Sequence, residues 1–223
     1  MARLIRSILI TLVCLALLLF VPAGGWKWPR GWLFFAVFTI TAVICLIILL
    51  RVNPDVLVAR SRLLGPGTKR WDVILITLLL PAVVAIVPVA ALDDGRFHWH
   101  PVLWWVSALG YVLLIAGFAG SVWAEAYNKF AEPSVRIQSE RGHAVISTGP
   151  YAIVRHPLYS ASFPLCVGAA LALGSLWGLI PAAIGSLILI VRTLLEDRTL
   201  QTELPGYKEY AQHVRFKLIP GVW

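Results

Sequence analysis

Two polar stretches of this chain carry side chains that could do chemistry, and both interrupt strongly apolar sequence. The first, GPYAIVRHPLY at residues 149–159, places an arginine and a histidine directly before Pro157. The second contains Arg192 and Glu196, which stand four residues apart and so share one face of a helix. Charged groups beside membrane-type sequence are costly and usually line a polar cavity. Two structural alternatives remain. The first stretch could be an interfacial helix cap with Arg155 on lipid phosphate, and Arg192 and Glu196 could form a surface ion pair.

Pro157 predicts where a helix begins. Proline disfavours helical geometry in the residue before it, here His156, and suits the first position of a helix. We therefore expect a helix from Pro157 with unpaired backbone N–H groups at its start. Since the positive end of the helix dipole would face the polar loop, a partly anionic ligand could bind there.

The elements that position these residues are membrane spans. Of 223 residues, 59% are apolar and 13% charged, and the mean hydropathy is +0.82. This composition excludes an ordinary soluble protein and predicts an all-α, polytopic transmembrane bundle. The apolar runs give about six spans, at residues 4–21, 31–50, 73–92, 102–122, 158–173 and 176 to about 195.

The spans divide the chain into two parts. Residues 1–123 hold four N-terminal spans, and residues 124–223 hold a polar loop, a helical hairpin turning at Gly174 and Ser175, and a polar tail. We expect the first span to be a retained anchor, although its arginines and the following VPAGG also fit a signal peptide.

The basic residues predict the orientation. With both termini on one side, only Lys27, Arg30 and Arg96 of the nineteen lysines and arginines fall on the other. The positive-inside rule then predicts that both termini lie in the cytoplasm. We expect the chain to be an integral protein of the cytoplasmic membrane. The net charge of +8 suits an anionic leaflet, so membrane lipids are expected partners and nucleic acid is not.

The loops hold weaker signals. Asn53 and Pro54 predict a short amphipathic surface helix ended by Gly65, with a substrate-gating element as the alternative. The loop at 93–100 carries Asp and His residues, but their loose spacing predicts no metal site. Three cysteines, Cys14, Cys45 and Cys166, lie within apolar spans and are expected to be free.

A joint pattern in the C-terminal part carries a family resemblance. GPYAIVRHPLY, a hairpin, Arg-x-x-x-Glu, LPGYKEY and the final RFKLIPGVW follow one another from about residue 138 to 223. Together they resemble the isoprenylcysteine carboxyl methyltransferase family and its phospholipid methyltransferase relatives. The resemblance implies an integral-membrane enzyme that uses S-adenosyl-L-methionine and a lipophilic or lipidated substrate. The chain departs from the pattern at Ala161, where relatives usually have Gly, and at Asp197, where they have Glu.

The resemblance also implies roles for particular residues. Arg192 corresponds to the family's substrate-binding arginine and is the expected catalytic residue, and Glu196 corresponds to its cofactor-binding glutamate. The rest of the expected cofactor site is Gln138, His143, Ala144, Val145, Ile146, Tyr151, His156, Pro157, Leu158 and Tyr159.

The acceptor's chemistry stays open. A carboxylate acceptor needs only a cation such as Arg192 to hold it, and carboxyl O-methylation of an isoprenylcysteine-like lipid is the leading hypothesis. An amine or a thiol must lose a proton, which favours a base such as His143 or His156. The other hypotheses are a sterol reductase and a transporter or structural membrane protein. Neither the acceptor nor the oligomeric state can be read from the sequence.

Overall fold

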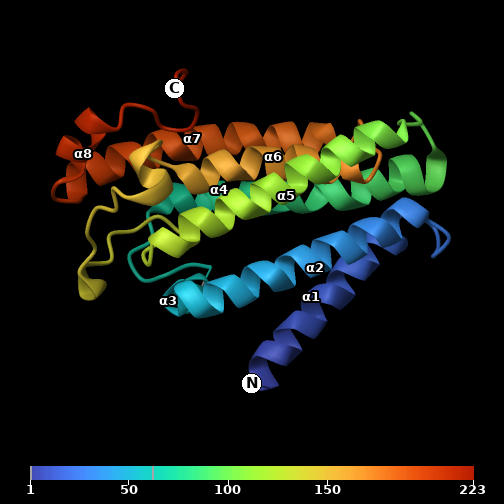
Figure 1. Cartoon of the computed structure of the whole chain (residues 1–223), viewed down its shortest axis with the longest axis horizontal. Helices are drawn as coiled ribbons and strands as arrows, with labels where there is room; N and C mark the ends of the chain where they lie inside the picture. The colour runs from blue at the N-terminus through green and yellow to red at the C-terminus, as the bar shows by residue number, and fades with distance from the viewer. Residues whose placement is uncertain (1, 62) are drawn as a thin grey trace.

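A computed structural model describes residues 2–61 and 63–223, and within these ranges it contains helices and no strand, as the predicted all-α class requires. The chain runs through a long bundle of α-helices with short helical turns between them (Figure 1). The α-helices are α1 (Ala2–Phe20), α2 (Pro29–Val52), α3 (Pro54–Arg60), α4 (Arg70–Ala90), α5 (Trp104–Tyr127), α6 (Pro157–Ala172), α7 (Leu179–Glu203) and α8 (Tyr207–His213), with a π-helix η1 (Ala91–Phe97) and 3₁₀ turns η2 (Ser139–Arg141) and η3 (Gly149–Ala152).

Four helices are long and apolar enough to cross a membrane. These are α2, α4 with its π-helical extension, α5 and α7. Two shorter apolar helices, Arg6–Phe20 and α6, occupy the places of the first and fifth predicted spans. All six predicted apolar segments are therefore helical, but the number that crosses the bilayer stays a prediction.

The tightest contact joins α5 and α6, and glycines make it possible. A Cβ on Gly110 would lie 2.2 Å from the backbone nitrogen of Ala172, and one on Gly168 would lie 2.4 Å from that of Leu114. Helices in lipid approach this closely where small residues line the interface, because association there depends on close packing. The α5–α6 pair thus fixes where the polar loop between them begins and ends.

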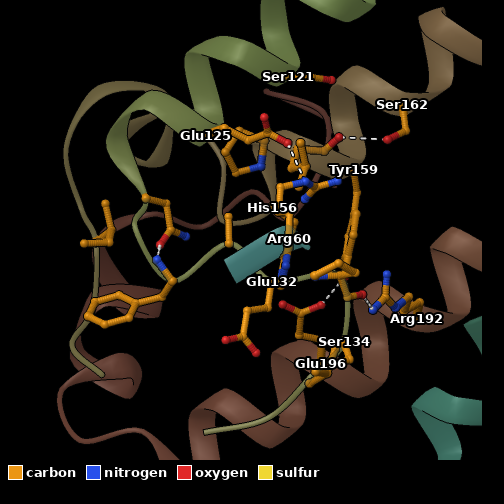
Figure 2. A pocket seen from close by; sticks show the side chains of 18 of the residues that line it. Arg60, Ser121, Glu125, Glu132, Ser134, His156, Tyr159, Ser162, Arg192 and Glu196 are labelled. Carbon is orange, nitrogen blue, oxygen red and sulfur yellow. Dashed lines mark hydrogen bonds and ion pairs between the residues drawn. The ribbon is translucent and has the colours of Figure 1, made fainter. Parts of the chain in front are cut away.

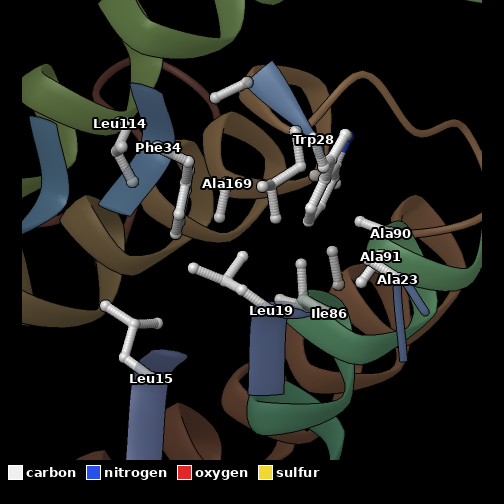
Figure 3. Packing of buried hydrophobic residues seen from close by; sticks show 14 of the residues in the cluster. Leu15, Leu19, Ala23, Trp28, Phe34, Ile86, Ala90, Ala91, Leu114 and Ala169 are labelled. Carbon is white, nitrogen blue, oxygen red and sulfur yellow. The ribbon is translucent and has the colours of Figure 1, made fainter. Parts of the chain in front are cut away.

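We call the end of the bundle with the turns at 21–28, 98–103 and 173–178 the packed end, and the opposite end, with α3, α8 and the 128–156 loop, the pocket end (Figure 1). Apolar side chains from α1, α2, η1 and the α4–α6 helices meet at the packed end (Figure 3). Among them are Leu19, Trp28, Phe34, Ile86 and Leu114.

Buried ionic and polar contacts tie the packed end together. Arg30 of α2 forms a salt bridge with Asp94 of η1, and Asp93 accepts a hydrogen bond of 2.6 Å from Ser175 in the turn after α6. Trp177 Nε1 donates to His100 Nδ1 at 3.0 Å. In the described part of the chain, no three His, Cys, Asp or Glu side chains are grouped so that they could hold a metal ion.

The predicted surface helix begins where expected and is held differently. α3 starts at Pro54 with Asn53 before it, but the Asn53 side chain does not cap the helix. Its Nδ2 instead donates to the backbone carbonyl of Glu125 at the end of α5, at 2.7 Å. Residue 62, within the expected surface segment, lies outside the described residues.

Candidate active site

A pocket of about 620 Å³ occupies the pocket end, between the bundle and its polar loops (Figure 2). Its wall comes from α2 and α4–α7, from the 128–156 loop and from α8. The structure brings every sequence-predicted site residue into this one wall: Gln138, His143, Ala144, Val145, Ile146, Tyr151, His156, Pro157, Leu158, Tyr159, Arg192 and Glu196.

The loop before α6 and the tail after α7 are bonded to each other. The backbone N–H of Arg155 donates to the carbonyl of Phe216 at 3.0 Å, and that of His156 to Lys217 at 2.9 Å. Tyr210 Oη donates to the Tyr151 carbonyl at 2.7 Å. The tail therefore runs alongside the loop and accepts hydrogen bonds from the two amides before Pro157. The unpaired N–H groups were expected at the start of α6, where those of Tyr159 and Ser160 donate to the His156 carbonyl at 3.1 Å.

Asp197 is the buried carboxylate that joins these segments. Arg155 donates to both of its oxygens, at 2.8 and 3.0 Å, and also to the Val214 and Arg215 carbonyls of the tail. Tyr207 Oη donates to the same carboxylate at 3.2 Å. Arg155 is thus a buried structural link rather than a cation on lipid phosphate.

Ala161, where relatives usually have Gly, lies outside the pocket wall. Ala161 is buried and sits against Gly120 of α5, where a Cβ on the glycine would lie 3.0 Å from the alanine Cβ. The small side chain at 161 therefore affects the packing of α6 on α5, and the pocket is lined by its neighbours Tyr159 and Ser162.

Arg192 pairs with a carboxylate that the sequence did not single out. Its Nε and Nη2 donate to the two oxygens of Asp72, in the first turn of α4, at 2.7 and 3.1 Å. Nη2 also donates to the Pro133 carbonyl. Asp72 is fully buried and accepts a further 2.6 Å bond from the backbone of Val135. The signal in the sequence was an acid at the start of an apolar span.

Glu196 does not pair with Arg192, so the proposed surface ion pair is wrong. Its carboxylate accepts a hydrogen bond from Tyr159 Oη, and no salt bridge to it occurs among the described residues. The Tyr159 ring lies parallel to His156, with centroids 5.8 Å apart, and the Arg192 guanidinium is 5.3 Å from its centroid. A carboxylate without a cation of its own faces the pocket beside aromatic surfaces (Figure 2).

The 128–156 loop is ordered by its own polar side chains. Gln138 Nε2 donates to the Phe130 carbonyl at 2.8 Å, and its Oε1 accepts from Arg141 at 2.6 Å. His143 Nδ1 accepts the backbone N–H of Gln138 at 3.3 Å, and its ring lies 4.6 Å from that of Phe130. Burial, followed by the nearby Arg136 guanidinium, lowers the pKa of His143, so the ring is neutral at pH 7.

A large apolar part of the pocket wall belongs to the spans. α2 and α4 line it from two sides, and α5 contributes Phe118 and Val122. The α2 and α4 side chains are Ala42, Cys45, Leu46, Leu49, Ile76, Leu79, Leu80 and Val83. The pocket therefore has a polar half made of loops and an apolar half made of membrane helices.

Further charged groups in the wall were missed by the sequence reading. Arg136 donates to both oxygens of Glu132, at 2.7 and 2.9 Å, and pairs with Glu140. These bonds, led by that to Glu132, raise the pKa of Arg136. Arg60 of α3 pairs with Glu125 of α5. The Arg60–Glu125 pair could not be found in the sequence, because an i, i+4 pattern reports only contacts within one helix and these residues lie on two helices.

The fold and the pocket together define a helical membrane protein with a site shared between polar loops and apolar spans. The phospholipid methyltransferase family model matches residues 105–204, which run from the start of α5 to the end of α7. Over this region the chain is similar to that family, in agreement with the resemblance drawn from the motifs.

Two curated proteins are similar to the chain over 137 residues. The nickel-cobalt-cadmium resistance protein NccN of Alcaligenes xylosoxydans xylosoxydans is 26% identical, over 58% of this chain and 58% of its own length. The cobalt-zinc-cadmium resistance protein CzcN of Cupriavidus metallidurans is 28% identical, over 58% of this chain and 57% of its own length. The chain thus matches less than two thirds of the length of either relative.

Proposed function

We propose that the chain transfers a methyl group from S-adenosyl-L-methionine to a lipophilic acceptor, with both held in the one pocket. The observation that carries this proposal is the pocket's composition: a carboxylate with no cation partner among the described residues stands beside aromatic rings in the polar half, and apolar helices form the other half. Similarity to the phospholipid methyltransferase family suggests the reaction class.

The polar half fits the cofactor's chemistry. A volume of about 620 Å³ is within the range of small-molecule pockets. Glu196 offers a negative charge to a cationic group, and Tyr159 and His156 offer ring faces to a cation. The segment from His143 to Ile146 and the residues around Tyr151 would hold the remainder of the molecule. Bound there, S-adenosyl-L-methionine supplies an electrophilic methyl group on a sulfonium.

The acceptor proposed first is a carboxylate on an isoprenylcysteine-like lipid. The Nε and Nη2 atoms of Arg192 are already hydrogen-bonded, which fixes the position of the guanidinium and leaves Nη1 to bind a ligand. A guanidinium in a fixed position can orient a carboxylate for reaction. The apolar helices exclude water, which favours a reaction that cancels opposite charges.

An amine or thiol acceptor is the second candidate, and His143 is the observation that favours it. The imidazole is neutral at pH 7 and lies in the pocket wall, and its Nδ1 can accept a proton from such an acceptor if it gives up the 3.3 Å hydrogen bond from the Gln138 N–H. The roles of these side chains, and the division of the chain at residue 123, are parts of the proposal.

Orientation follows from the basic residues. We place the pocket end at the cytoplasmic face, because the lysines and arginines outside Lys27, Arg30 and Arg96 belong to its loops and helix ends. The cofactor would enter from the cytosol, and the lipid from the bilayer between α2 and α4, whose side chains line the apolar half.

The test uses the full chain purified in detergent. Calorimetry with S-adenosyl-L-methionine should show binding, and Glu196→Gln should weaken it by about tenfold or more, because a charged hydrogen-bonding partner is lost. Glu203→Gln, on the same helix but exposed and outside the pocket wall, should not. Methyl-labelled cofactor and a membrane lipid extract should give a labelled lipid, and Arg192→Ala should reduce its yield. Absence of cofactor binding by the wild type would refute the proposal.

A further inference from the structure

One ion pair in the pocket wall has no part in the function proposed so far. Glu125 lies near the end of α5, is only 7% exposed, and faces Arg60, the last residue of α3. The Arg60 Nε lies 3.1 Å from Glu125 Oε1, and both residues line the pocket (Figure 2). Burying the Glu125 carboxylate costs free energy of desolvation, so its position calls for a reason.

Arg60 differs from the other pocket arginines in how little holds it. Arg136, Arg155 and Arg192 each grip both oxygens of a carboxylate and have further partners. Within the described residues, Arg60 has a single contact to one oxygen of Glu125, and its side chain is 35% exposed. Three guanidinium groups are therefore held in fixed positions, and the fourth can rearrange.

Glu125 has bonding capacity to spare. Among the described residues, no hydrogen bond is donated to its carboxylate, and neither carboxylate oxygen is sealed inside the protein without a partner. The end of α5 is held instead by Asn53, whose Nδ2 donates to the backbone carbonyl of Glu125. The backbone position is thus fixed without using the side chain, which is open to the pocket.

The pair stands at the border between the two halves of the pocket. Leu49, Leu57 and Val122 lie beside it on the apolar side, and His156 and Tyr159 line the polar side. A lipid whose chain fills the apolar half would bring its polar end to this border. A partner for Arg60 must be anionic, and a partner for the open Glu125 oxygen must be cationic or donate a proton.

We propose that Arg60 and Glu125 form the subsite for the polar end of the acceptor, and that this end is zwitterionic, with an ammonium on Glu125 and an anion on Arg60. A zwitterion placed antiparallel to the ion pair satisfies all four charges. A polar end with a single charge leaves one member of the pair without compensation in a low-dielectric site. This inference rests on the proposed function and narrows it: in a lipidated amino acid the single carboxylate would bind Arg60 in place of Arg192, and in a zwitterionic lysolipid the phosphate would bind Arg60.

A matched set of ligands with one farnesyl chain tests the inference. S-farnesylcysteine carries both charges, its N-acetyl derivative carries only the anion, and S-farnesylcysteamine carries only the ammonium. Their binding to the full chain in detergent is measured by calorimetry. We expect the wild type to bind the zwitterion about tenfold more tightly than either singly charged ligand. Lysophosphatidylethanolamine and lysophosphatidic acid form a second pair, which separates the two sources of a zwitterion.

Two variants assign the preference to the pair. Glu125→Gln should bind the zwitterion no better than the anion, and Arg60→Gln should bind it no better than the cation. Glu209→Gln and Arg198→Gln, both exposed and outside the pocket wall, should retain the wild-type preference. If Glu125→Gln does not fold, as judged by thermal unfolding, the partly exposed Arg60 carries the test alone.

The outcomes separate this inference from the proposed function. Equal binding of the three farnesyl ligands by the wild type, or an unchanged preference in both variants, would overturn the zwitterion subsite. If methyl transfer to lipid occurs alongside either result, the proposed function stands without it. A preference that depends on Arg60 and Glu125 in a protein that transfers no methyl group would support the subsite and refute the methyltransferase proposal.

Discussion

At the packed end, apolar side chains such as Leu19, Phe34 and Leu114 fill the space between the helices, and Arg30 is bound to Asp94. At the pocket end the same helices separate around a pocket of about 620 Å³, and Arg192 is bound to Asp72. Both ends therefore bury one arginine–aspartate pair between helices distant in sequence. Only one of the two pairs faces space that a ligand can occupy.

The difference teaches how one bundle can be rigid and still hold a site. Close helix contacts at α5–α6 hold the helices together without charged side chains, since the small residues Gly110 and Gly168 allow the backbones to meet. The pocket end instead relies on ion pairs and on hydrogen bonds between loop and tail, which keep polar side chains in place around an open volume. Variants that act on one end alone should separate stability from function.

The largest effect is expected at the two buried ion pairs. Asp72→Ala leaves the Arg192 guanidinium buried without its carboxylate, and Asp94→Ala does the same to Arg30; each should cost about 3–5 kcal/mol of unfolding free energy. Thermal or denaturant unfolding in detergent measures the loss. Both variants should be destabilised, but only Asp72→Ala should also reduce methyl transfer per folded molecule.

A double variant sharpens this prediction. Replacing both partners, as Asp72→Asn with Arg192→Leu, removes the unpaired charge and should recover much of the stability without recovering activity. Recovery of methyl transfer in the double variant would show that Arg192 has only a structural role. An equal loss of activity per folded molecule in Asp94→Ala would contradict the distinction between the two ends.

A smaller effect is expected from adding one methyl group at the α5–α6 contact. In Gly168→Ala the new Cβ would lie 2.4 Å from the backbone nitrogen of Leu114, so α5 must move, and overpacking of this kind costs about 1–3 kcal/mol. Gly185→Ala is the matched control on α7, because its Cβ would meet side-chain methyl groups and no backbone atom, Val83 at 3.3 Å and Leu79 at 3.8 Å. Unfolding temperatures compare the two, and equal values would refute the role given to Gly168.

The sequence predicted the elements well because each is encoded locally. Apolar runs and Pro157 placed the spans and the start of α6, and the motif from 149 to 159 with Arg192 and Glu196 indicated one region, whose residues the structure brings into a single wall. The resemblance supplied the reaction class, which the family match over residues 105–204 supports.

The partners of the charged residues could not be predicted. Arg192 pairs with Asp72, 120 residues away, and Arg60 pairs with Glu125 across two helices. Such contacts depend on how helices are arranged in space, which an i, i+4 pattern in one helix does not report. The same limit applies to the amides of Arg155 and His156, because the tail that accepts their hydrogen bonds lies about 60 residues further along the chain.

The smallest predicted effect concerns pH and again sets the pocket end apart. The folded-state pKa of His143 is lowered, first by burial and then by Arg136, so the unfolded chain takes up this proton more readily than the folded one. The stability that neutral His143 contributes is therefore present above its ordinary pKa near 6.5 and is lost as the pH falls below that value. Unfolding followed from pH 7.5 to 5.5 should show this loss, and His143→Gln should flatten the slope of stability against pH, because the position then no longer titrates.

Arg30→Lys at the packed end should leave this slope as it is, because neither side chain titrates in this range. An unchanged slope in His143→Gln would assign the acid sensitivity to other groups and remove the reason to regard this imidazole as a neutral proton acceptor in the pocket.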